Sequence, residues 1–175
     1  GVGKALLKLF RTLGIFVPIV TSEEKAGHQS TLIHHIPNAC ALLALNEIGR
    51  LTKISDHRQE LTAFYITEAQ KNGWTYPSSV SLDYPLQKFP LLVENAGDIR
   101  RKLKSHNIHL DDGWTDATVC PASSDESEAN YRHGSCPEAD RVGLEILSLP
   151  THPTMTMKQA QELVQRLQSL LHGSH

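Results

Sequence analysis

Two adjacent histidines, His34 and His35, are the first residues whose type could do chemistry. Imidazole binds metal ions and anions and transfers protons near neutral pH. Neighbouring side chains point in different directions, so such a pair rarely binds one ion together. The favoured interpretation is therefore a turn or the start of a helix, and a ligand role is the alternative.

A second group consists of Cys120, His133 and Cys136, the last two spaced as His-x-x-Cys. With one further histidine these side chains would suffice for a zinc ion. Their spacing matches none of the usual paired ligand patterns of zinc proteins. We therefore expect loop residues here and predict no metal site.

The segment Asp111-Asp112-Gly113-Trp114 brings two carboxylates next to an aromatic ring. Asp-Gly is mainly a turn signal, so the carboxylates need no catalytic role. Trp114 is the candidate for a substrate-facing residue, with a packing aromatic as the alternative.

A sheltered lysine would permit Schiff-base chemistry, and the sequence offers no obvious one. Most lysines lie on or beside expected helices among polar neighbours, and Lys88 lies in an expected strand, opposite its apolar face. None follows a Ser- or Gly-rich strand and turn. The sequence also lacks a complete phosphate-binding loop, a dinucleotide fingerprint and a G-x-S-x-G elbow. We therefore predict no catalytic residue in this chain.

Composition indicates an ordinary globular domain without a nucleic-acid or membrane partner. Of the 175 residues, 39% are hydrophobic and 21% are charged, with a formal net charge of -2. A near-neutral chain gives no electrostatic reason to bind nucleic acid or an anionic membrane. No apolar run approaches the ~20 residues that span a bilayer. Three cysteines favour a reducing compartment, which predicts a cytoplasmic location.

Hydrophobic spacing divides the chain into an arm, a long helix and a small α/β domain. A short helix at about 2–14 opens an irregular arm over 1–36, and a long helix is expected over 37–73. Pro37 suits its first turn and Gly73 its end. The first turns of this helix are apolar nearly all round, so we expect them to be buried against another domain or subunit. We interpret 173–175 as a purification-tag remnant.

The small domain is expected over 74–172 and begins with a connector at 74–86. Its elements are a strand at 87–93, a helix at 96–106, a short strand at 108–110, a long loop at 111–134, a helix at 137–147, a strand at 147–150 and a final helix. Capping boxes are expected at Ser135 with Glu138 and at Thr156 with Gln159. The fold class is therefore α+β, a two-layer α/β sandwich with a small mixed or antiparallel sheet, helices on one face and a long bridging helix before it.

Two stretches resemble the DegT/DnrJ/EryC1/StrS family of pyridoxal-phosphate (PLP) dependent aminotransferases. One runs from Pro37-Asn38 through an Ala- and Leu-rich helix to Ile48-Gly49-Arg50-Leu51. The other, Cys136-Pro137-Glu138-Ala139-Asp140-Arg141 followed by Leu147-Ser148-Leu149-Pro150-Thr151-His152-Pro153, is similar to the family's "P-x-A-(D/E)-R … L-(S/N)-L-P-x-H-P". The resemblance covers roughly residues 30–171.

This resemblance implies the C-terminal small domain of a fold-type I PLP enzyme. Family members transfer an amino group from an amino acid to a keto sugar on a nucleotide, and they are typically homodimers. It implies PLP for the full-length protein and none for this chain, because the large domain with its Schiff-base lysine would be missing. A homodimer through 37–51 is the implied partner.

The segment before the helix departs from the family pattern. The family usually shows N-x-R there, whose Asn reaches toward the phosphate of the partner subunit's cofactor, whereas this chain has Ile33 and His35. His35 would be a smaller, titratable replacement for the arginine. His35 and Asn38 are accordingly the candidate cofactor-binding residues, on the side of the partner's phosphate.

Two hypotheses stay open beside such a fragment, which would be inactive alone. One is a free-standing, non-enzymatic dimerisation or interaction module derived from that domain. The other is a small His/Cys metalloprotein.

Overall fold

The computed structural model describes residues 2–14, 23, 26, 28, 35–110, 114–122, 124, 126–127 and 129–172. Its described elements follow the order α1 (Val2–Thr12), α3 (Asn38–Gly49), α4 (Leu51–Asn72), β1 (Lys88–Leu92), α5 (Ala96–Ser105), α6 (Pro137–Glu145), β2 (Ile146–Pro150) and α7 (Met157–His172). The expected tag remnant at 173–175 lies outside these residues. No helix among the described residues has the length and apolar content needed to cross a membrane.

The sheet consists of two antiparallel strands. β1 pairs with β2 from Lys88 opposite Pro150 to Leu92 opposite Ile146. Phe89 and Leu91 alternate with more exposed neighbours along β1, as a half-buried strand requires. The predicted α+β fold class with a small antiparallel sheet is confirmed.

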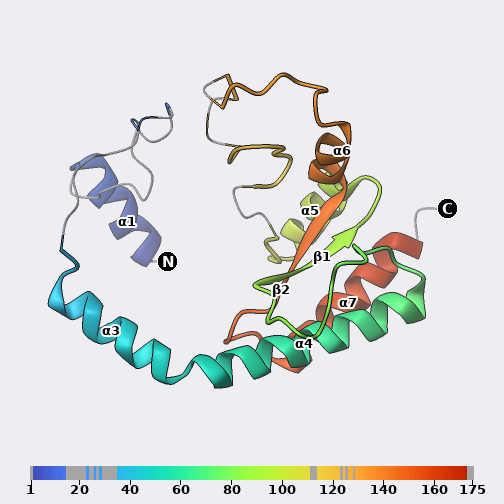
Figure 1. Cartoon of the computed structure of the whole chain (residues 1–175), viewed down its shortest axis with the longest axis horizontal. Helices are drawn as coiled ribbons and strands as arrows, with labels where there is room; N and C mark the ends of the chain where they lie inside the picture. Colours follow the sequence, from blue (N-terminus) through green and yellow to red (C-terminus); the bar gives the residue numbers. More distant parts are fainter. Residues whose placement is uncertain are drawn as a thin grey trace.

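Helices α4 and α7 lie together against the sheet and enclose the core (Figure 1). Tyr65 on α4 is almost fully buried, and its ring lies against Phe89 on β1. Its hydroxyl donates a hydrogen bond of 3.0 Å to the Pro150 carbonyl, and burial raises the pKa of that phenol. Leu163 and Leu167 supply the apolar side of α7. This core fixes β2 and the segments that follow it.

The N-terminus of α7 confirms the second capping box. The Gln159 backbone N–H donates to the Thr156 hydroxyl at 3.2 Å, and the Thr156 N–H donates to the Gln159 side-chain oxygen at 2.9 Å. These reciprocal bonds satisfy N–H groups that the first helical turn leaves without partners.

The range expected to form one long helix is divided in two. Arg50, with φ -102° and ψ 0°, separates α3 from α4, and its N–H bonds to Glu47 three residues back. Gly49 directly precedes this break, and glycine weakens a helix interior because it has no side chain to restrict the backbone. As predicted, α4 ends at Gly73, which adopts the left-handed conformation with φ 67°.

Two local expectations were wrong. Residues 108–110 follow α5 without forming a strand. Asn107 has φ 62°, and the Ile108 N–H donates to the Leu103 carbonyl, so this N–H is not available to pair with another strand. The capping box at Ser135 is also absent, since α6 has Cys136 at its N-cap and no side-chain cap bond.

Candidate functional site

His35 and Asn38, the candidate cofactor-binding residues, lie at the start of α3. Both side chains are exposed. Pro37 between them is extended, with φ -57° and ψ 139°, and the Ala41 N–H bonds to its carbonyl, so α3 begins directly after this residue. The neighbouring His34 lies outside the described residues. Near His35 and Asn38, the described chain supplies no buried group that would complete a phosphate site.

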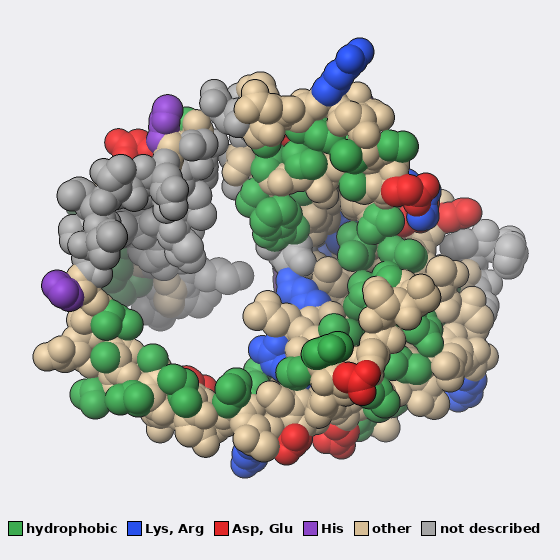
Figure 2. All heavy atoms as spheres, viewed as in Figure 1, with side chains coloured by type: hydrophobic (Ala, Val, Ile, Leu, Met, Phe, Trp, Pro, Cys, Tyr) green, Lys and Arg blue, Asp and Glu red, His purple; other side chains and the backbone are tan. Residues whose placement is uncertain are grey.

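Helix α3 has an apolar surface that the described chain does not cover. None of its residues is buried, and Leu42 and Leu45 are 68% and 65% exposed. We use the term α3 apolar surface for Leu42, Leu43, Leu45 and Ile48. Figure 2 shows hydrophobic side chains gathered along this helix. An apolar surface of this extent usually marks a contact with another protein surface.

Trp114 lies at a pocket of about 260 Å³ between residues 114–118, α6 and β2. We call this the Trp114 pocket, and Thr118, Val142, Gly143 and Ile146 also line it. The Trp114 side chain is 54% exposed, so it borders the pocket rather than filling the core. A substrate-facing role for Trp114 stays a prediction. The preceding residues 111–113 lie outside the described chain.

The segment that carries Trp114 is held against the domain by a buried cation. Arg100 on α5 is 5% exposed, and its guanidinium contacts the Asp116 carboxylate at 2.5 Å. The same side chain donates to the Ile146 carbonyl at 2.9 Å. One residue therefore connects the loop, α5 and the start of β2.

A close backbone contact lies next to this ion pair. A Cβ atom at Gly143 of α6 would lie 2.9 Å from the Ala117 carbonyl oxygen, which is closer than real Cβ atoms approach. Only glycine permits the loop to pass this near the helix.

Asp140 on α6 collects hydrogen bonds from the same loop. Its carboxylate accepts from the Thr118 hydroxyl at 2.8 Å, the Tyr131 hydroxyl at 2.6 Å and the Gly134 N–H at 3.2 Å. The bonds from Tyr131 and Thr118 lower the pKa of Asp140, because they favour the charged carboxylate. The hydrogen bond from the Tyr131 hydroxyl to Asp140 also raises the pKa of Tyr131, because its ionisation would place two negative charges side by side.

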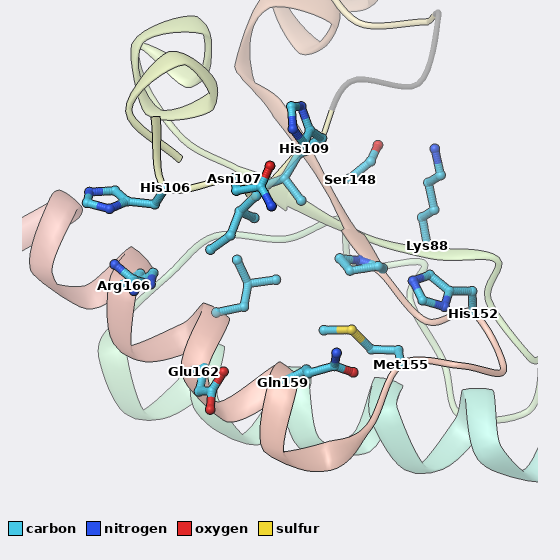
Figure 3. Close-up of a pocket in the computed structure, with 14 residues that line it drawn as sticks. Lys88, His106, Asn107, His109, Ser148, His152, Met155, Gln159, Glu162 and Arg166 are labelled. Atoms are coloured by element: carbon cyan, nitrogen blue, oxygen red, sulfur yellow. The ribbon is translucent and has the colours of Figure 1, made fainter. Parts of the chain in front are cut away.

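A larger groove of about 500 Å³ runs between residues 106–110, the two strands and α7. Figure 3 shows Arg166 and His106 at one end and Lys88 and His152 at the other. The groove also contains His109, and Glu162 is the only carboxylate among its described lining residues. The basic side chains would attract an anion, but all of them are exposed, so we assign the groove no role.

The described residues do not fit a complete PLP site. Such a site needs a Schiff-base lysine, an acidic partner for the pyridine nitrogen and a phosphate cradle. The buried polar residues of the described chain are Thr62, Arg100 and Thr151, with no lysine among them. Lys88 lines the groove but is exposed. We therefore derive no catalytic step through this cofactor.

The zinc hypothesis has no support from the described part of the chain. Within it, no three histidine, cysteine or carboxylate side chains come together in a group able to hold a metal ion. His133, Cys120 and Cys136 belong to the loop region and the start of α6, and both cysteines are free thiols.

Sequence reasoning missed Arg100 and the role of Asp140. Asp140 has the sequence signature of a helix-start carboxylate, and its partners are 6 to 22 positions away. The only signal was its place within the P-x-A-D-R stretch.

Comparison with known proteins identifies relatives of the fold. The model of the DegT/DnrJ/EryC1/StrS aminotransferase family matches residues 7–168. The crystal structure of DesV from S. venezuelae, in complex with a ketimine intermediate, is similar with a TM-score of 0.58 and 22% identity, over 71% of this chain and 33% of that one. A DegT DnrJ EryC1 StrS aminotransferase from Brucella abortus gives a TM-score of 0.58 at 16% identity, over 73% of this chain and 34% of that one. No curated protein sequence matches this chain.

Proposed function

Because the chain belongs to the DegT/DnrJ/EryC1/StrS aminotransferase family, we propose that it is the C-terminal small-domain part of a PLP-dependent aminotransferase that acts on nucleotide-linked keto sugars. We further propose that it does not transfer amino groups by itself. The chain spans about a third of the length of the two solved relatives, at 33% and 34%.

The single observation that carries this proposal is that the described side chains include no sheltered lysine beside an intact small-domain core. The sheet, α4 and α7 form a packed unit. The lysines whose side chains the structure describes are all exposed, namely Lys8, Lys53, Lys71, Lys88, Lys102, Lys104 and Lys158. A Schiff-base lysine is activated by a pocket that removes its amine from water, which an exposed position does not provide.

Two sets of residues take their proposed roles from this assignment. His35 and Asn38 would approach the phosphate side of a PLP bound by a partner subunit, and Trp114 would border the substrate. The exposure of these three side chains supports these roles, because each lies outside the small-domain core and can contact a cofactor or substrate bound by another part of the protein.

The α3 apolar surface supports a proposed homodimer through residues 37–51, completed by a large domain. Leu42, Leu45 and Ile48 expose between 64% and 68% of their area, which is costly in water. The three free cysteines support a reducing compartment such as the cytoplasm.

Reduction with borohydride in the presence of PLP tests the absence of a cofactor lysine. We expect weak labelling spread over several exposed lysines, as seen by peptide mass spectrometry, and total labelling of Lys88→Gln that falls by no more than the share of one such lysine. One pyridoxyl group per chain on a single lysine, lost in its Gln variant, would refute the proposal.

The second candidate function is a free-standing interaction module, which the α3 apolar surface specifically favours. Light scattering of the isolated chain tests it. Self-association that Leu42→Asp with Leu45→Asp abolishes, and that Leu82→Asp in the exposed connector leaves intact, supports this function. A strict monomer at high protein concentration excludes it.

A further inference from the structure

Asp140 connects both ends of the loop between residues 114 and 135 to α6. One carboxylate oxygen accepts hydrogen bonds from Thr118 and Tyr131, and the other accepts from the backbone of Gly134. Thr118, Tyr131 and Gly134 lie 22, 9 and 6 residues before Asp140 in the sequence. A single carboxylate therefore closes a long, irregular segment onto the helix.

The other carboxylates of α6 behave differently. Glu138 and Glu145 both pair with Arg141 along the helix surface, at the spacings i,i+3 and i,i+4. Such exposed pairs contribute little to stability. Asp140 alone among these acids accepts hydrogen bonds from the loop, so its contribution concerns where the loop lies.

The loop is fixed at three consecutive residues just after Trp114. Asp116 contacts Arg100, Ala117 passes close to Gly143, and Thr118 bonds to Asp140. Trp114 is 54% exposed, so burial covers only part of its side chain. The anchors at residues 116–118 restrict the position of the backbone that carries it.

We propose that Asp140 is a positioning residue whose hydrogen bonds to Thr118, Tyr131 and Gly134 hold Trp114 at the rim of the Trp114 pocket. The proposal deepens the proposed function, because it names the residue that orients the candidate substrate-facing side chain. Its physical basis is independent of the cofactor, since all the groups involved belong to this chain.

Fluorine NMR of the full chain labelled with 5-fluorotryptophan tests this proposal. The sequence contains two tryptophans, Trp74 and Trp114, so the spectrum has two resonances that Trp114→Phe assigns. In Asp140→Asn we expect the Trp114 resonance to move toward the solvent-exposed position and the Trp74 resonance to stay. Solvent accessibility at Trp114 rises by at most about twofold, because half of the side chain is exposed already.

Two matched variants separate positioning from a general loss of structure. Glu138→Gln removes a carboxylate two residues earlier on the same helix and leaves both resonances unchanged. Asp140→Glu keeps a carboxylate and restores most of the wild-type Trp114 resonance. An unchanged Trp114 resonance in Asp140→Asn, or equal displacement of both resonances, overturns the proposal. The borohydride experiment addresses the proposed function separately, so either result can fail alone.

Discussion

Arg100 is the buried charge on which the small domain depends. It is 5% exposed, whereas its partner Asp116 is 53% exposed. Water therefore screens the carboxylate, and the ion pair itself is worth less than a fully buried one. The bond to the Ile146 carbonyl matters more, since that oxygen would lose its donor at the start of β2.

Arg100→Met should therefore destabilise the chain by about 1–3 kcal/mol, the cost of an unsatisfied buried polar group. Chemical denaturation followed by circular dichroism measures this change. The matched control is Arg101→Met, because Arg101 is 78% exposed and pairs with Asp98 on the surface. Its effect should stay within about 0.5 kcal/mol. Equal effects for both variants would contradict the role assigned to Arg100.

Asp140 gives the loop a defined pH dependence. Its pKa in the folded chain lies below the ordinary value of 3.8, so the folded state holds fewer protons than the unfolded state in this range. Its stabilisation is complete above pH ~4 and is lost as the pH falls through the lowered pKa. Denaturation of the wild type and Asp140→Asn should give curves that differ at pH 6 and converge as the pH falls below ~4. A difference that stays constant down to pH 2 would show that the carboxylate is not involved.

Among the elements, α6 and its adjoining loop are the most sensitive to added volume. Gly143→Ala should be destabilising by roughly 1–3 kcal/mol, because the new methyl group meets the Ala117 carbonyl and the surroundings must move. Gly97→Ala in α5 is the control, since its nearest heavy atom is at 3.8 Å. That change should be neutral or stabilising by up to about 1 kcal/mol through helix propensity. Thermal denaturation of both variants checks the difference in sign.

Several elements were predictable because local chemistry determines them. The Thr156 and Gln159 box marks the start of α7, and Gly73 marks the end of α4. Alternation at Phe89 and Leu91 identified β1. The break at Arg50 was not predicted, because the apolar pattern continues across it and Gly49 was the only local sign of a weaker helix.

The candidate site could be predicted only in part. Trp114 became a candidate because an aromatic directly after an Asp-Gly turn signal is visible in the sequence. Its supports were not found, because Arg100, Asp116 and Asp140 come from three separate segments and share no spacing. Tertiary contacts of this kind leave no periodic signal.

At the scale of the whole molecule, α3 extends from the start of α4 away from the sheet. Helix α1, which precedes α3 in the sequence, lies on the same side (Figure 1). The core lies in the small domain, whereas α3 has no buried residue. This division agrees with the family match and with the share of the solved relatives that the chain covers.

The most direct test of this account is the conversion of added PLP to pyridoxamine phosphate by the purified chain with excess glutamate. This half-reaction needs no keto sugar, only an amino donor and a site that holds the cofactor beside a suitable lysine. We expect a rate equal to that of protein-free buffer, and equal again for Lys88→Gln. Conversion of one equivalent of PLP per chain, faster than buffer and dependent on a single lysine, would contradict the account.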